Sequence, residues 1–163
     1  MVTFNHPGSE REAPYTHIIL LSTPLIFTLV WFLDSFFLNW TTILNTIIIF
    51  PIRLSLFIGI FAAAIYLIRL SHVTLFDESE PSKTLITTGI FKYTRNPLYL
   101  GILLIYVAMI LLSISLISIG VLAIIALLYD RLATFEEGIL EEMFGEEYRK
   151  YKDTVAKWIP KLF

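Results

Sequence analysis

The sequence predicts an all-α polytopic membrane protein with about four transmembrane helices, and two observations lead to this fold class. Hydrophobic residues make up 56% of the 163 residues, more than the roughly 45–50% of a typical soluble domain. Several apolar runs are continuous and reach the roughly 20 residues that a helix needs to cross a bilayer. Continuous runs favour helices over the strands of a membrane barrel, because barrel strands alternate apolar and polar residues.

The predicted elements follow one another in a single membrane-embedded domain. The first span runs from Ile18 to about Phe37, and the second ends near Leu70. Residues 38–53 are either a re-entrant piece or part of span two, because Pro51 fits the start of a helix as well as a kink within one. The domain then divides into a tail (1–16), two spans (17–70), a cytoplasmic loop (71–96), a helical hairpin (97–130) and a C-terminal amphipathic helix (131–163).

The hairpin is predicted from its boundaries. Asn96 is a favoured N-cap and Pro97 is tolerated at the first helical position, so the third span begins there and runs to about Leu112. The fourth span runs from about Leu116 to Tyr129. A tight turn between the two is indicated by Ser113, Ser115 and Ser118.

The C-terminal helix is predicted from apolar residues at helical spacing. These residues are Leu140, Phe144, Tyr148, Tyr151, Val155 and Ile159. An amphipathic helix of this kind commonly lies on the bilayer surface. Gly145 costs such a helix about 1 kcal/mol relative to alanine, so either the helix breaks there or close packing requires a glycine.

Basic residues predict the orientation in the membrane. Of the twelve Lys and Arg residues, the turn between spans three and four holds none, whereas the 71–96 loop and the C-terminal tail hold most. Cytoplasmic segments are enriched in these residues. We therefore expect that loop, the C-terminus and, with four spans, the N-terminus on the cytoplasmic side.

Composition excludes several classes of function. Cysteine is absent, which removes disulfides, thiolate nucleophiles and Cys-ligated zinc. The three histidines form no metal-ligand spacing, so we expect no metal site. We also expect no nucleic-acid partner, and the sequence leaves the oligomeric state open.

Two polar regions carry the candidate chemistry. The loop ends in Arg95 and the predicted helix start at Asn96, where a cation and free N–H groups can bind a carboxylate or phosphate. Glu136 and Glu137 lie close to the end of the fourth span, and acidic residues there usually face protein rather than lipid. Together the two regions suit a zwitterionic ligand. The simpler alternatives are an ordinary membrane-interface loop and an ion pair between one glutamate and Arg95 or Arg131 that ties the tail down.

The same two regions resemble a family signature. Its first half matches residues 85–101, which include Thr94-Arg95-Asn96-Pro97 and end at Gly101. Its second half is two glutamates, an apolar pair and a Phe-Gly-Glu-Glu-Tyr block, which here are Glu136-Glu137, Ile139-Leu140 and Phe144-Gly145-Glu146-Glu147-Tyr148. On these two blocks, residues 83–160 resemble the isoprenylcysteine carboxyl methyltransferase and phospholipid methyltransferase family.

The resemblance implies an integral membrane methyltransferase that uses S-adenosylmethionine and releases S-adenosylhomocysteine. The acceptor would enter from the bilayer and would be a prenylcysteine-type carboxylate, a phospholipid amine or another small lipid. Catalytic roles are implied for Arg131 and Glu136, and Glu136 would meet the ammonium group of the cofactor. The residues implied to bind the cofactor are Lys83, Thr84, Leu85, Ile86, Gly89, Phe91, Arg95, Asn96, Pro97, Leu98, Tyr99, Glu136 and Glu137.

Two departures from the family pattern bear on the acceptor. Many relatives have His where this chain has Asn96, and Asn does not titrate near neutral pH. Many also have Arg four residues before the first glutamate, where this chain has Leu132. Arg131 is one residue away, which is about 100° of rotation on a helix. Two alternative functions stay open: an NADPH-dependent membrane reductase similar to the sterol reductases, and a non-catalytic membrane scaffold.

Overall fold

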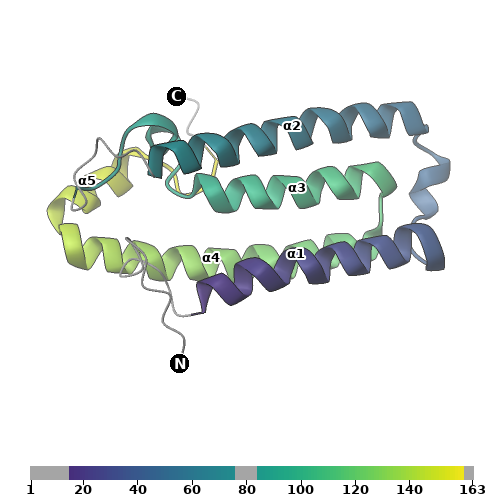
Figure 1. The fold of residues 1–163 in the computed structure, drawn as a ribbon, viewed down its shortest axis with the longest axis horizontal. Coiled ribbons are helices and arrows are strands. Elements are labelled where there is room, and N and C mark those ends of the chain that lie inside the picture. The colour runs from purple at the N-terminus through teal and green to yellow at the C-terminus, as the bar shows by residue number, and fades with distance from the viewer. Residues whose placement is uncertain (1–14, 76–83, 160–163) are drawn as a thin grey trace.

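The structure, a computed structural model, describes residues 15–75 and 84–159, and in these ranges every regular element is helical. The elements in chain order are α1 (Thr16–Phe32), η2 (Leu33–Leu38), η3 (Ile43–Thr46), α2 (Phe50–Leu75), η4 (Gly89–Lys92), α3 (Pro97–Ser113), α4 (Leu116–Phe144) and α5 (Glu146–Thr154). Figure 1 shows α1 to α4 as an elongated bundle in which each helix runs opposite to the one before it. The predicted all-α class is confirmed for the described residues.

Three of the described helices are long and apolar enough to cross a membrane: Thr16–Leu38, Phe50–Leu75 and Leu116–Phe144. Large apolar side chains are exposed along all three, among them Leu25, Ile58 and Leu127. Exposed apolar surface on this scale is typical of helices that face lipid. The chain is therefore an integral membrane protein.

The structure settles how the first two spans are bounded. The first continues from α1 through the π-helical turn η2 and ends at Asn39, whose backbone is left-handed. Pro51 is the second residue of α2, where its missing N–H costs no helical hydrogen bond. Of the two interpretations of this proline, the helix start is correct. Residues 39–49 form a link that contains the single 3-10 turn η3.

The fourth helix is longer than the sequence predicts. α4 has 29 residues and ends at Phe144 rather than near Tyr129, so the prediction of a single amphipathic helix that begins at residue 131 is wrong. The break comes at Gly145, whose φ of +55° favours glycine. No described atom lies within 4 Å of the position that a Cβ would occupy there. Gly145 is therefore required by the turn and not by close packing.

Two packing contacts hold the bundle together. α3 lies close against α2, because a Cβ on Gly101 would lie 2.5 Å from Ile68 Cγ1 and 3.2 Å from the Ala64 carbonyl oxygen. A second contact joins α1, α3 and α4 through buried aromatic side chains, with Phe27 stacked on Tyr106 at 4.4 Å between ring centroids. Gly101 thus sets how closely α3 approaches α2.

The connectivity gives the bundle two different ends, which we call the α5 end and the η3 end (Figure 1). The α5 end holds the beginnings of α1 and α3, the ends of α2 and α4, and α5 itself. The η3 end holds η2, η3 and the two-residue link between α3 and α4. Those residues predicted to carry the chemistry that the structure describes belong to the α5 end.

Candidate functional site

The start of α3 is built as predicted in its backbone but not in its side chain. Asn96 occupies the N-cap position and Pro97 follows at the first helical position. The Asn96 side chain makes no capping hydrogen bond. Its amide nitrogen instead donates to Glu137 Oε1 at 3.0 Å and to the Lys157 carbonyl oxygen at 3.3 Å. The first turn of α3 is therefore left without a side-chain cap.

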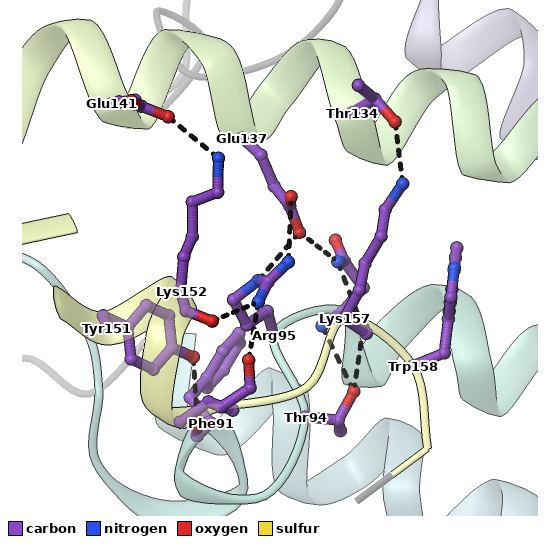
Figure 2. Close-up of polar contacts among 12 residues, drawn as sticks. Phe91, Thr94, Arg95, Thr134, Glu137, Glu141, Tyr151, Lys152, Lys157 and Trp158 are labelled. Carbon is purple, nitrogen blue, oxygen red and sulfur yellow. Dashed lines mark hydrogen bonds and ion pairs between the residues drawn. The ribbon is translucent and has the colours of Figure 1, made fainter. Parts of the chain in front are cut away.

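Arg95 and Glu137 form an ion pair in the interior of the α5 end (Figure 2). Arg95 Nε donates to Glu137 Oε1 at 3.0 Å and Nη2 donates to Oε2 at 3.1 Å. Each of the two side chains is only 10% exposed. Arg95 Nη1 also donates to the backbone carbonyls of Lys152 and Val155. The guanidinium thus binds Glu137 of α4 and two backbone carbonyls of the C-terminal segment. The predicted ion pair between Arg95 and one of the two glutamates is therefore present.

Residues 155–159 follow α5 as a non-helical segment, which we call the strap. Its backbone forms an isolated parallel bridge between Ala156 and Thr94. The Arg95 N–H donates to the Ala156 carbonyl at 3.0 Å, and the Thr94 hydroxyl donates to the Lys157 carbonyl at 3.1 Å. The strap therefore lies directly across the loop that precedes α3 (Figure 2).

Glu136 has different partners from its neighbour Glu137. The Tyr99 hydroxyl donates to Glu136 Oε1 at 2.7 Å, and the Thr16 hydroxyl donates to the same oxygen at 3.4 Å. One residue is about 100° of rotation on a helix. Glu136 consequently faces α1 and α3, whereas Glu137 faces Arg95 and the strap.

Two tyrosines of α5 fix that helix against the loop before α3. The Tyr151 hydroxyl donates to the Phe91 carbonyl oxygen at 2.7 Å (Figure 2). Burial raises the pKa of Tyr151 to about 12. Burial, and next the Glu137 carboxylate, also raises the pKa of Tyr148. Both side chains are therefore neutral at physiological pH, Tyr151 as a hydrogen-bond donor and Tyr148 as a packing group.

The predicted site residues fall into three groups. The structure brings together Arg95, Asn96, Tyr99, Glu136 and Glu137. Leu85 packs beside the strap with Tyr148 and Tyr151, Pro97 is buried, and Gly89 has a positive φ where η4 begins. Thr84, Ile86, Phe91 and Leu98 belong to the same loop and first helical turn, and Lys83 lies outside the described residues.

Arg131 is the predicted residue that stands apart. Its side chain is on the exposed side of α4, whereas the adjacent Leu132 is 8% exposed and belongs to the buried cluster with Tyr99. The position at which the family resemblance expects an arginine therefore points inward and holds Leu132, whereas Arg131, one residue earlier, points outward.

The sequence analysis does not predict three polar contacts beside the candidate site. Lys157 Nζ binds Asp130 Oδ1 at 2.6 Å, Trp158 Nε1 donates to the same oxygen at 3.0 Å, and Lys152 Nζ binds Glu141 Oε2 at 2.9 Å. The spacing of Asp130, Glu137 and Glu141 does place these acids on one face of a continuous helix. That signal was hidden because the helix was expected to end near residue 129.

Comparisons with known proteins place these contacts in a context. Residues 54–147, more than half of the chain, match the family described as phospholipid methyltransferase. The chain is 41% identical over 63 residues to an uncharacterized protein of Haemophilus influenzae. The matched region covers 38% of this chain and all of that protein. No solved structure matches the chain. The family match contains Arg95, Asn96, Tyr99 and both glutamates and ends before the strap.

Proposed function

The chain belongs to the phospholipid methyltransferase family, and from that premise we propose that it transfers a methyl group from S-adenosylmethionine to a lipid acceptor at the α5 end. One observation carries the proposal. The start of α3 and the two glutamates of α4, about 40 residues apart in sequence, meet through the contacts of Tyr99 with Glu136 and of Asn96 with Glu137. A site that joins an acid to a helix start suits a zwitterion.

The residues present fit the amino-acid part of the cofactor. Glu136 accepts hydrogen bonds from two hydroxyl groups. Its carboxylate is suited to bind the ammonium group of the cofactor through a charge-assisted hydrogen bond. The first turn of α3 suits a carboxylate, because its N–H groups have no side-chain cap and the helix dipole favours negative charge there. We propose that Thr84 to Ile86, Gly89, Phe91 and Asn96 to Tyr99 line the rest of the site.

The contacts of Arg95 and Glu137 favour a supporting role for this pair. Each Glu137 oxygen accepts from Arg95, and one also accepts from Asn96. A buried carboxylate with these partners has little capacity left for a ligand. We therefore propose that Arg95 and Glu137 hold the loop, α4 and the strap in place, and that Glu136 is the acid that meets the cofactor.

Little acid–base chemistry is needed at such a site. The cofactor supplies a methyl group that is already activated by its sulfonium. The protein contributes by fixing the acceptor in line with that methyl group and by excluding water. Tyr99 positions Glu136 through its hydroxyl group, and Trp158 of the strap packs against the buried cluster to which Tyr99 belongs.

The surroundings favour an acceptor without a carboxylate. Arg95 is engaged by Glu137 and two backbone carbonyls, and the position at which the family resemblance expects an arginine holds the buried Leu132. Arg131 is exposed. Because none of these side chains offers a cation to the interior, we propose a phospholipid amine as acceptor and assign Arg131 no contact with it.

We propose that α3 is a fourth span. It has 17 residues, at the lower limit of the roughly 17–25 that cross a bilayer. Together with α4 it would form the predicted hairpin through Ile114 and Ser115. The α5 end would then face the cytoplasm with both termini, as the distribution of Lys and Arg predicts.

The proposed function is tested with the full chain in lipid nanodiscs. Isothermal titration with S-adenosylhomocysteine should show binding at one site per chain, and labelled S-adenosylmethionine should transfer its methyl group to phosphatidylethanolamine and not to phosphatidylglycerol. Absence of cofactor binding would remove the proposal. Transfer to a prenylcysteine carboxylate would correct the acceptor, and NADPH-dependent reduction of a lipid would favour the reductase instead.

A further inference from the structure

The strap is fastened to α4 through one face of that helix. Asp130, Thr134, Glu137 and Glu141 recur at spacings of four and three, so their side chains project in nearly the same direction. Each of the three acids pairs with a cation from the opposite side. Lys157 binds Asp130, and Figure 2 shows Arg95 at Glu137 and Lys152 at Glu141. We call this row of residues the seam; it joins α4 to the strap, to α5 and to the loop before α3.

The ion pairs along this seam differ in burial. In the pair that we call the inner fastening, Arg95–Glu137, each side chain is 10% exposed, and the guanidinium also binds two backbone carbonyls, those of Lys152 and Val155. At the outer fastening, Lys157 is 21% exposed and Asp130 is 45% exposed. Exposed ion pairs contribute roughly 0–1 kcal/mol because water and salt screen them. The outer fastening therefore opens much more readily than the inner one.

The outer fastening also covers the interior. Trp158 donates to Asp130 at 3.0 Å, and its ring packs against the buried cluster that contains Tyr99 and Leu132. Tyr99 in turn binds Glu136. Release of Lys157 and Trp158 from Asp130 would thus free the Trp158 ring to leave the cluster that contains Tyr99, the partner of Glu136, while the Ala156 bridge to Thr94 stays closed.

We propose that Asp130, Lys157 and Trp158 form a releasable clasp, and that its opening sets the rate at which the cofactor and its product enter and leave. The proposal rests on the proposed function, because it takes the cofactor site to lie beside Tyr99 and Glu136. Asp130 and Lys157 are positioning residues in this scheme. Their contacts hold Trp158 over the site and touch no reacting atom.

The test compares Lys157→Met with a matched control, Arg149→Met, in full-length protein in nanodiscs. Lys157→Met keeps the apolar stem and the backbone carbonyl that binds Thr94, but it removes the ammonium group from Asp130 and Thr134. Arg149→Met breaks exposed pairs with Glu141 and Glu146 and leaves the clasp intact. Lys157→Arg keeps the positive charge and should restore the wild-type behaviour.

Two measurements decide the outcome. Hydrogen exchange of the strap peptide, without ligand, should be faster in Lys157→Met than in wild type and unchanged in Arg149→Met. The dissociation rate of S-adenosylhomocysteine should rise roughly two- to fivefold in Lys157→Met, the factor that corresponds to loss of one partly exposed ion pair, with little change in thermal midpoint.

Unchanged exchange in the strap would overturn the clasp. Faster exchange with an unchanged dissociation rate would overturn its role in ligand exchange. A fall in thermal midpoint as large as that of an Arg95→Met variant would show that Lys157 is structural, and it would overturn the proposal as well. A wild-type protein that binds no S-adenosylhomocysteine would instead remove the proposed function on which the clasp depends.

Discussion

The two ends of the bundle both bury a carboxylate, but they surround it with different groups. At the η3 end, Asp34 is 2% exposed and accepts hydrogen bonds from the backbone N–H and hydroxyl of Thr41 and from the hydroxyl of Ser115. At the α5 end, Glu137 is held by the guanidinium of Arg95 and the amide of Asn96.

Their neighbours differ in the same way. Around Asp34, Ser35 and Ser113 bind each other at 2.7 Å, and the Arg53 guanidinium binds Asn45 and the Leu112 carbonyl at the end of α3. These polar groups close the links between helices. At the α5 end, Glu136 and the first turn of α3 lie beside the ion pair and suit a ligand. The polar groups of the η3 end thus join neighbouring helices, whereas the α5 end is the one at which we propose that a ligand binds.

Glu137→Ala should have the largest effect of any single change at the α5 end. It leaves Arg95 buried without its carboxylate, and removal of one partner of a buried ion pair costs about 3–5 kcal/mol. Denaturant unfolding in detergent measures the loss. Glu142→Ala, at an exposed position on the same helix, is the control and should change stability by less than about 0.5 kcal/mol. Equal effects of the two variants would contradict the central role of the pair.

Glu136→Gln should separate ligand binding from stability. The amide oxygen can still accept from Tyr99, so the fold should tolerate the change, but the negative charge that suits an ammonium group is lost. A charge-assisted hydrogen bond contributes about 1.5–3 kcal/mol, so binding of S-adenosylhomocysteine should weaken roughly 10- to 100-fold. Titration calorimetry measures this. Unchanged affinity would mean that Glu136 is structural like its neighbour.

Asp34→Asn should show the converse at the η3 end. One carboxylate oxygen is replaced by an NH₂ group, which faces the hydroxyls of Thr41 or Ser115 as a second donor. We expect a loss of about 1–2 kcal/mol of stability and unchanged affinity for S-adenosylhomocysteine, because the site lies at the opposite end of the bundle. A loss of affinity in a stably folded variant would show that the two ends are coupled.

The sequence predicts the helices well because their signals are local. Run length, Pro97 at a helix start and Gly145 at a break each act within a few residues. The end of the fourth helix was missed for a tertiary reason. The polar residues after Tyr129 resemble the exit from a span, but Asp130, Glu137 and Glu141 stay helical with cations from distant segments as partners.

The sequence predicts that two regions meet at the candidate site, but it does not predict which residue of each region contacts which. Charge and order along the chain indicated that Arg95 and the glutamate pair lie on one side of the membrane. Which glutamate would bind Arg95 depends on a rotation of about 100° about the α4 axis, and that rotation is fixed by packing of Leu132 and Ala133 against the core. The strap is predicted as helix, because Val155 and Ile159 continue the apolar spacing of the C-terminal helix, but α5 ends at Thr154.

Tyr151→Phe should have the smallest effect and should be most visible at high pH. The change removes the hydrogen bond to the Phe91 carbonyl, which costs about 1 kcal/mol at neutral pH. Because the pKa of Tyr151 is about 12 in the folded protein and about 10 in an unfolded chain, folding favours the neutral form. That contribution is complete below about pH 10 and is lost as the pH rises towards 12. Thermal midpoints measured across this range should fall less steeply in Tyr151→Phe than in wild type, and parallel curves would show that Tyr151 ionises freely. The η3 end offers the control: Asp34→Asn should shift the whole curve and leave its slope between pH 10 and 12 unchanged, because no tyrosine is altered there.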